Sequence, residues 1–284
     1  MPNLFGGIEV LDEVEALTGN VRVLGATAYL RRLYKALDEA GYGDRIMIDK
    51  MVGKTEVALY GLAYSIGMLV QLFISGMNSA LTPWMYSKIK KGDIRSMRKV
   101  LQLLSIVVVG IAVALMLISP ELVLIFGSPK YREAVYVIPP VAASVFFIFI
   151  YNILSMPQFY YEKTQFLMAA SMAAAGANVV LNFIFIRLFG YIAAGYTTLA
   201  CYMLYSVGHY IVSKRILVNE GIQENLMSPG FLVACSVFLI GASIICNLIF
   251  PYRILRYAIL LASAGLVFWK KELLLKTMAD IRKK

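Results

Sequence analysis

The sequence predicts an all-α, polytopic membrane protein with about seven transmembrane helices. Hydrophobic residues make up 60% of the 284 residues and charged residues only 15%, whereas a soluble domain is roughly half apolar and a quarter charged. Several long stretches contain no Asp, Glu, Lys or Arg, and each reaches the about 20 residues that a helix needs to cross a bilayer. The strand-length alternation of a membrane barrel does not occur in the sequence, so helices are the expected spanning elements.

Six charge-free stretches and one shorter stretch define the expected spans. The shorter stretch becomes long enough if the basic side chains that flank it, Arg253, Arg256, Lys270 and Lys271, extend to the two membrane interfaces. The expected spans, with ends uncertain by a few residues, are 56–78, 100–119, 134–156, 166–186, 192–212, 229–250 and 253–270.

The first 43 residues differ in character from the rest. Residues 1–43 carry a net charge of −2, whereas residues 44–284 carry +12. Residues 29–40 have the spacing of an amphipathic helix that ends at Gly41. A basic start followed by an apolar run is missing, so we expect no cleavable signal peptide. We therefore divide the chain into a soluble, unassigned N-terminal segment, 1–43, and a transmembrane bundle, 44–284.

The basic residues predict the orientation of the bundle. Lys and Arg concentrate in loops on the cytoplasmic side of a membrane. Alternate loops hold fifteen basic residues on one side, which includes the C-terminus, and five on the other. The sequence thus predicts a multi-pass protein of the cytoplasmic membrane with a cytoplasmic C-terminus. The net charge of +10 is explained by this topology and by contact with anionic membrane lipids, and it does not indicate nucleic-acid binding.

Polar residues inside the spans form faces along single helices. At 100° per residue, the polar side chains of the first span fall within about 40° of one another, and those of the fourth and fifth spans behave similarly. Two interpretations are open: these residues join helices by hydrogen bonds, or they line a water-filled cavity whose amides and aromatic rings suit a sugar. The second interpretation predicts as substrate-binding residues Tyr60, Tyr64, Gln71, Asn78, Asn152, Asn178, Asn182, Tyr202, Tyr205 and His209.

The sequence offers little for catalysis. No carboxylate is expected inside the core of any span, so a membrane hydrolase or a carboxylate-driven pump has no obvious catalytic group. The three cysteines lie apart in expected spans and predict neither a metal site nor a disulfide. The string Gly53-Lys54-Thr55 lacks the first glycine of a phosphate-binding loop, since position 48 is Ile. We expect no enzyme activity, no cofactor and no metal.

Four segments carry a resemblance to a known family. They are 44–48 (DRIMI), 52–60 (VGKTEVALY), 81–86 (LTPWMY) and 178–202 (NVVLNFIFIRLFGYIAAGYTTLACY). The chain resembles the Wzx-like polysaccharide-repeat flippases of the multidrug/oligosaccharidyl-lipid/polysaccharide exporter superfamily. The longest segment joins two helices through a glycine turn that is typical of these proteins. It departs from their pattern at Arg187, where proline is common, and at Ala193, where glycine is frequent.

The resemblance covers 44–284 and corresponds to the C-terminal half of a two-bundle, MATE-like transporter. It implies that residues 44–51 are the tail of a preceding helix. It also implies that the protein flips a polyprenyl-linked oligosaccharide across the cytoplasmic membrane for surface polysaccharide or glycan assembly. One bundle cannot enclose the cavity alone, so the expected partner is a second copy or a separate N-terminal half. The alternatives are a scaffold subunit of a glycan-assembly complex and a small-molecule exporter of the same superfamily.

Overall fold

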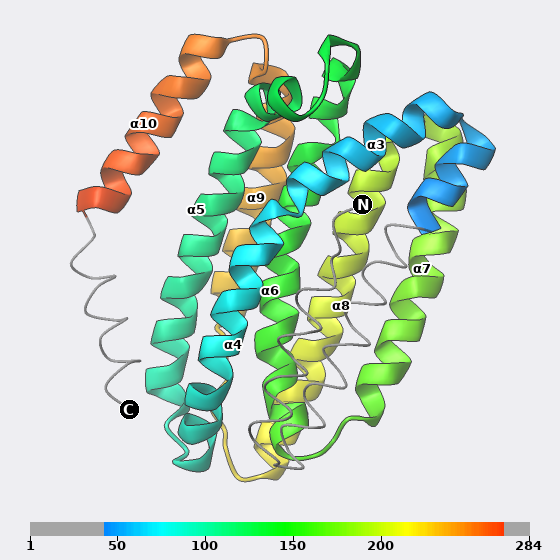
Figure 1. Ribbon diagram of the computed structural model, residues 1–284. Coiled ribbons are helices and arrows are strands. Elements are labelled where there is room, and N and C mark those ends of the chain that lie inside the picture. The colour runs from blue at the N-terminus through cyan, green and yellow to red at the C-terminus, as the bar shows by residue number, and fades with distance from the viewer. Residues whose placement is uncertain (1–42, 270–284) are drawn as a thin grey trace, which may run out of the picture.

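The computed structural model describes residues 43–269, which form helices and no strand (Figure 1). A short helix at 43–51 opens this range. The elements that follow are α3 (Lys54–Gly67), α4 (Leu69–Lys90), α5 (Ile94–Phe126), the 3₁₀ helix η1 (Pro129–Tyr136), α6 (Ile138–Tyr160), α7 (Gln165–Phe189), α8 (Ile192–Asn219), α9 (Pro229–Ile249) and α10 (Arg253–Trp269). The predicted helix at 29–40 lies outside the described residues.

From α4 to α10, successive α-helices run in opposite directions and are joined by short connections. The α4–α5 turn, the α6–α7 turn and the α8–α9 connection lie at one end of the bundle, the lower end in Figure 1. The connections through η1, from α7 to α8 and from α9 to α10 lie at the other end. Successive loops therefore lie at opposite ends of the bundle, as the counts of basic residues per side assumed. Which end faces the cytoplasm stays a prediction. We call the end with the α4–α5 turn the basic end, because the loops there hold most of the basic residues.

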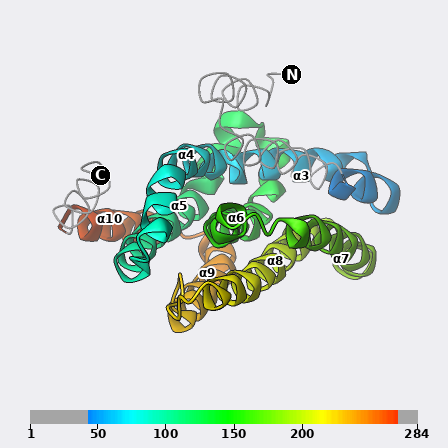
Figure 2. The same ribbon diagram turned by 90° about the horizontal axis from the view of Figure 1, so that it is seen from below.

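Helix α6 forms the centre of the bundle. Every residue from Ile138 to Gln158 is buried, because the helix packs against α3, α4, α5, α8 and α9. Figure 2 shows α6 between α3, α4 and α5 on one side and α8 and α9 on the other. The sequence accounts for this position, since a helix that is apolar on all sides belongs in a core. Pro139 and Pro140 occupy its first turn, where no backbone hydrogen bond is lost.

The first expected span, 56–78, is two helices in the structure. Helix α3 ends at Gly67 and α4 begins at Leu69, so the chain changes direction at Met68 (Figure 1). Gly67 permits a close approach: a Cβ placed there would lie 2.5 Å from Cγ1 of Val141 on α6. The break separates the expected polar face into Tyr60 and Tyr64 on α3 and Gln71 and Asn78 on α4.

Helices are present at all seven expected positions, but the count of seven spans stays a prediction. Five segments of the described chain are long and apolar enough to cross a membrane: α3 with α4, α5, α6, α7 and α9. Helix α8 is long but carries many polar residues, and α10 has only 17 residues. All-helical architecture and several membrane spans are therefore established for residues 43–269.

A partly buried ion pair attaches α10 to the rest of the bundle. The Arg256 guanidinium donates to both carboxylate oxygens of Glu121 on α5 at 2.8 Å, and to the carbonyl oxygen of Leu117 at 2.6 Å. That Arg256 extends to a membrane interface stays a prediction; in the described chain its side chain is 4% exposed, because it lies against Glu121. Arg253, by contrast, is exposed.

Candidate functional site

A buried carboxylate lies where the 43–51 helix meets α3, α7 and α8. Asp44 is 1% exposed and accepts three side-chain hydrogen bonds. Tyr60 Oη on α3 donates to Oδ2 at 2.6 Å, Thr198 Oγ on α8 donates to Oδ2 at 3.0 Å, and Asn182 Nδ2 on α7 donates to Oδ1 at 2.5 Å. A carboxylate removed from water is costly unless it is paired or hydrogen-bonded, so these donors hold Asp44 in place.

Two further side chains complete the network around Asp44. Asn182 Nδ2 also donates to Asn178 Oδ1 at 3.1 Å, and Asn182 Oδ1 accepts a hydrogen bond from the Thr197 hydroxyl. The two asparagines lie one turn apart on α7. The chain reverses at Gly190, whose φ of 75° favours glycine, so the start of α8 returns beside them. We call this set the Asp44 cluster: Asp44, Tyr60, Asn178, Asn182, Thr197 and Thr198.

The Asp44 cluster has the chemistry of a small cation site. It combines one carboxylate with amide, hydroxyl and phenol oxygens, the hard donors that bind alkali and alkaline-earth cations. A single bound positive charge would balance the one carboxylate of this cluster. Within residues 43–269, no group of three or more His, Cys, Asp and Glu side chains is placed to hold a metal ion, so a transition-metal site is not indicated there.

A second group of polar and aromatic side chains lies further along α8, toward the basic end. The Tyr151 ring on α6 stacks parallel to the Tyr202 ring at 6.3 Å between centroids and meets the Tyr205 ring edge-on at 4.8 Å. His209 lies edge-on to Tyr205 at 4.5 Å and to Phe166 at 5.7 Å. We call this set the Tyr151 cluster: Tyr151, Phe166, Tyr202, Tyr205 and His209.

Hydrogen bonds connect the Tyr151 cluster to α6 and α7. Gln158 Nε2 lies 2.8 Å from His209 Nδ1, and Tyr205 Oη lies 2.8 Å from Ser171 Oγ on α7. Since the Gln158 amide nitrogen is a donor, His209 Nδ1 accepts, and the neutral ring carries its proton on Nε2. Packing of rings, rather than a buried charge, characterises this cluster.

The structure distributes the predicted site residues unevenly. Tyr60, Asn178 and Asn182 belong to the Asp44 cluster, and Tyr202, Tyr205 and His209 belong to the Tyr151 cluster. The Tyr64 ring lies 5.8 Å from that of Tyr60. The remaining three are part of neither cluster as defined over the described residues: Gln71, Asn78 and Asn152. Asn152 is buried on α6, whereas Gln71 and Asn78 are half-buried on α4, beyond the break.

Sequence reasoning missed Asp44, Thr197 and Thr198. The expectation of no carboxylate concerned the expected spans, and Asp44 lies before the first of them, on the 43–51 helix, where side chains from three other helices enclose it. It escaped notice because it precedes the first expected span by twelve residues and lies beside the charged Arg45. An available signal was the assignment of 44–51 to the tail of a helix, which places Asp44 in a transmembrane element.

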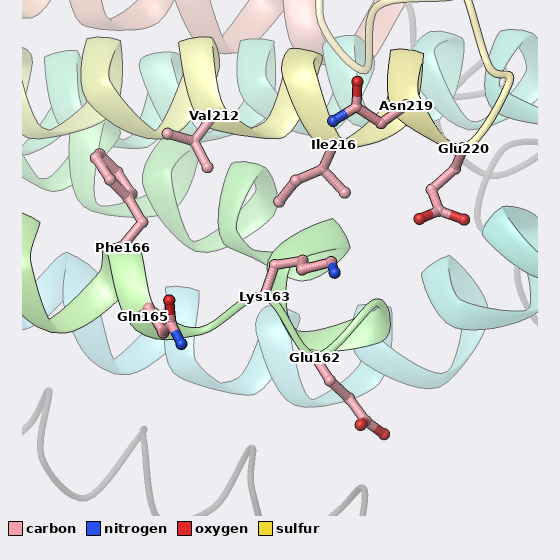
Figure 3. Close-up of a pocket in the computed structure, with 8 residues that line it drawn as sticks. All are labelled: Glu162, Lys163, Gln165, Phe166, Val212, Ile216, Asn219 and Glu220. Atoms are coloured by element: carbon pink, nitrogen blue, oxygen red, sulfur yellow. The ribbon is translucent and has the colours of Figure 1, made fainter.

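A pocket opens at the basic end of the bundle (Figure 3). It has a volume of about 440 Å³ and lies between the α6–α7 turn and the last turns of α8. Phe166 forms part of its wall, and the same ring contacts His209. In Figure 3 Lys163 lies on one side of the pocket, at the α6–α7 turn, and Asn219 and Glu220 lie on the other, at the end of α8. The pocket therefore adjoins the Tyr151 cluster and is not part of the Asp44 cluster.

Comparison with known proteins identifies the family. The MatE family model matches residues 42–184, which is half of the chain and includes Asp44, Tyr60, Asn178 and Asn182. The chain belongs to the MatE family. Its members are transporters rather than enzymes, so the chain is a multi-pass membrane protein of a transporter family. No solved structure matches the chain.

Curated relatives match only parts of the chain. An uncharacterized membrane protein of Haemophilus influenzae is 32% identical over 130 residues, which are 43% of this chain and 31% of that protein. The ATP phosphoribosyltransferase regulatory subunit of Clostridium acetobutylicum is 45% identical over 49 residues, 17% of this chain and 12% of that protein. The same subunit of Bacillus cereus is 36% identical over 72 residues, 24% and 17% of the two chains. The chain thus spans less than a third of the length of these relatives.

Proposed function

We propose that this MatE-family chain is one bundle of a transporter that flips a polyprenyl-linked oligosaccharide across the cytoplasmic membrane, and that a monovalent cation at Asp44 drives its change of conformation. The observation that supports this most directly is the Asp44 cluster. It connects four helices through one carboxylate, so any change in the charge of that site alters the contacts of all four.

The Asp44 cluster favours transport over a scaffold role. A buried carboxylate with polar ligands stabilises a fold no better than apolar packing of the same volume, and often less well. Ionisable groups inside a membrane bundle accordingly mark ion pathways and transport sites. A subunit that only holds other proteins together gains nothing from such a group, whereas a transporter uses it to bind a coupling ion.

The half-buried polar residues support an oligosaccharide as cargo rather than a small apolar drug. Tyr64, Gln71 and Asn78 lie along α3 and α4, where they are neither enclosed in the core nor fully exposed. Amides exchange hydrogen bonds with sugar hydroxyls, and a phenol ring offers an apolar face for a pyranose. A small-molecule exporter of the same superfamily is the alternative, and the cargo assay below separates the two.

The exposed flank of α7 supports the need for a second bundle. Helix α7 buries only 11% of its most apolar window within the chain, although it carries Asn178 and Asn182 on its inner face. The chain by itself therefore leaves the apolar outer flank of α7 uncovered. We propose that a second copy of this chain, or a separately encoded N-terminal half, covers it, with the basic end and the C-terminus in the cytoplasm.

The direct test is reconstitution of the purified chain in proteoliposomes with a fluorescent polyprenyl-diphosphate oligosaccharide, alone and with a supplied N-terminal half. Movement of the label between leaflets is the expected result. Absence of movement in both preparations would reject flipping. A transported drug-like cation in place of the lipid would support the exporter alternative.

Variants of the lining residues extend this test. Asn178→Ala removes a member of the Asp44 cluster, and Asn78→Ala removes an amide from α4. Both are expected to slow transport severalfold, and Asn178→Ala more strongly because its amide is buried and bonded. Unaltered movement in both variants would show that the chosen residues do not line the path.

A further inference from the structure

The pocket of Figure 3 lies at the level of the membrane head groups. Helix α8 has 28 residues and is about 42 Å long, which matches a bilayer with its head groups rather than the hydrocarbon core alone. Three tyrosine rings gather at this end: Tyr160 lies 5.5 Å from Tyr86 of α4 and 4.9 Å from Tyr161, between centroids. Tyrosine is enriched at the membrane–water interface. The α6–α7 turn and the last turn of α8, which border the pocket, therefore lie beside lipid head groups.

A tight turn after α6 brings charged residues to this pocket. The backbone N–H of Glu162 donates to the carbonyl oxygen of Phe159 at 3.1 Å, and that of Lys163 donates to the carbonyl oxygen of Gln158 at 2.8 Å. This is the pattern of a Schellman turn, and Glu162 takes its left-handed position with a φ of 57°. The reversal places Glu162 and Lys163 across the pocket from Glu220, at the end of α8 (Figure 3).

The pocket combines charges of both signs with an apolar wall. Two carboxylates and one ammonium line it, and Phe166, Val212 and Ile216 supply the wall. Within residues 43–269, neither Lys163 nor Glu220 forms an ion pair or a side-chain hydrogen bond. Both side chains are exposed. A positive and a negative charge are thus available to one ligand, beside a surface that suits a hydrocarbon chain.

We propose that this pocket binds the head group of a zwitterionic phospholipid with a primary ammonium, as in phosphatidylethanolamine. The phosphate pairs with Lys163, and the ammonium pairs with Glu220 and Glu162. The first carbons of an acyl chain lie against Phe166 and Val212. This ligand is a lipid of the surrounding membrane and not the cargo, so the inference goes beyond the proposed function and is independent of Asp44.

Charge and hydrogen bonding select this class of lipid. A purely anionic head group meets two carboxylates in the pocket, although the loops at this end are mainly basic. A primary ammonium has three N–H donors for the carboxylates and for the side-chain oxygens of Gln165 and Asn219, whereas a trimethylammonium has none. The volume of about 440 Å³ is in the range of small-ligand sites. A bound lipid would join the α6–α7 turn to the end of α8.

The test is lipid binding to the purified full chain, measured by native mass spectrometry. Phosphatidylethanolamine, phosphatidylcholine and phosphatidylglycerol with the same acyl chains are titrated separately. We expect one site that prefers phosphatidylethanolamine about tenfold over the other two. Equal affinity for all three would overturn the proposal. Soluble phosphoethanolamine should compete only weakly, because it lacks the chain that contacts the wall, and competition as strong as that of the lipid would overturn a membrane lipid as the ligand.

Two exposed substitutions separate the pocket from a general effect of charge. Lys163→Gln and Glu220→Gln should each lower phosphatidylethanolamine affinity about three- to fivefold, the scale of an exposed ion pair. They should act oppositely on phosphatidylglycerol, because Glu220→Gln removes a repulsion and Lys163→Gln removes an attraction. Lys214→Gln and Glu224→Gln are the matched controls, exposed at the same end but outside the pocket, and should change neither affinity. Control variants that match the pocket variants would overturn the site.

Discussion

The Asp44 cluster and the Tyr151 cluster are built differently, although both draw on α8. The Asp44 cluster contains a charge, and its members satisfy one another with hydrogen bonds from four helices. The Tyr151 cluster contains no charged group in its neutral form, and within the described chain His209 Nε2 and Gln158 Oε1 are buried without a partner. The first is thus organised around an ion, whereas the second is organised by ring packing.

This difference predicts which of the two clusters is more sensitive to substitution. A charged network is sensitive to the loss of any one partner, because the others are left with a buried ion. Ring packing distributes its energy over many weak contacts and tolerates single changes. We therefore expect matched substitutions to have larger effects around Asp44 than around Tyr151.

Tyr60→Phe should give the largest stability effect of three comparable substitutions. It removes the 2.6 Å hydrogen bond to the Asp44 carboxylate while it keeps the ring. A hydrogen bond to a charged group contributes about 2 kcal/mol, which corresponds to a fall of roughly 4 to 8 °C in the unfolding temperature. Thermal unfolding of the purified protein measures it. An unchanged unfolding temperature would show that the phenol does not support the charge.

Gly67→Ala tests the close contact between the end of α3, which carries Tyr60, and α6, which carries Tyr151. The new Cβ would lie 2.5 Å from Val141 Cγ1, and a β-branched side chain cannot turn away freely. We expect destabilisation by about 1.5 kcal/mol. Gly76→Ala on α4 is the control, since nothing lies within 4 Å of its Cβ position, and it should be neutral or stabilising. Equal effects at both positions would contradict the close approach.

Tyr205→Phe should give the smallest effect. It removes the neutral 2.8 Å hydrogen bond between Tyr205 Oη and Ser171 Oγ and leaves the ring contacts with Tyr151 and His209 in place. The expected cost is about 1 kcal/mol, or a fall of roughly 2 to 4 °C in the unfolding temperature. A fall larger than that of Tyr60→Phe would reverse the comparison between the two clusters.

The helices could be predicted because their signals are local. Charge-free apolar runs mark α5, α6, α7 and α9, and 3.6-residue geometry placed Asn178 and Asn182 on one face. The break at Met68 was not predicted, because it depends on the contact of Gly67 with a residue 74 positions later. The burial of Arg256 was missed similarly, since its partner Glu121 is 135 positions away.

The site could be predicted only in part for the same reason. Tyr60, Asn178 and Asn182 were selected by their own helices, but the group that unites them was not. Asn182 and Asp44 are separated by 138 positions, and Thr198 and Asp44 by 154. No periodicity in a single helix carries that information. The candidate site therefore appears only when the helices are assembled.

The most direct test of the central claim compares flipping with and without an inward-directed Na⁺ gradient, for the wild type and two aspartate variants. Asp44→Asn removes the buried charge, and Asp49→Asn removes an exposed one on the same short helix. Each protein is reconstituted with any second bundle that activity requires. We predict that a Na⁺ gradient accelerates flipping by the wild type and Asp49→Asn but not by Asp44→Asn. A gradient response that survives in Asp44→Asn would contradict the account.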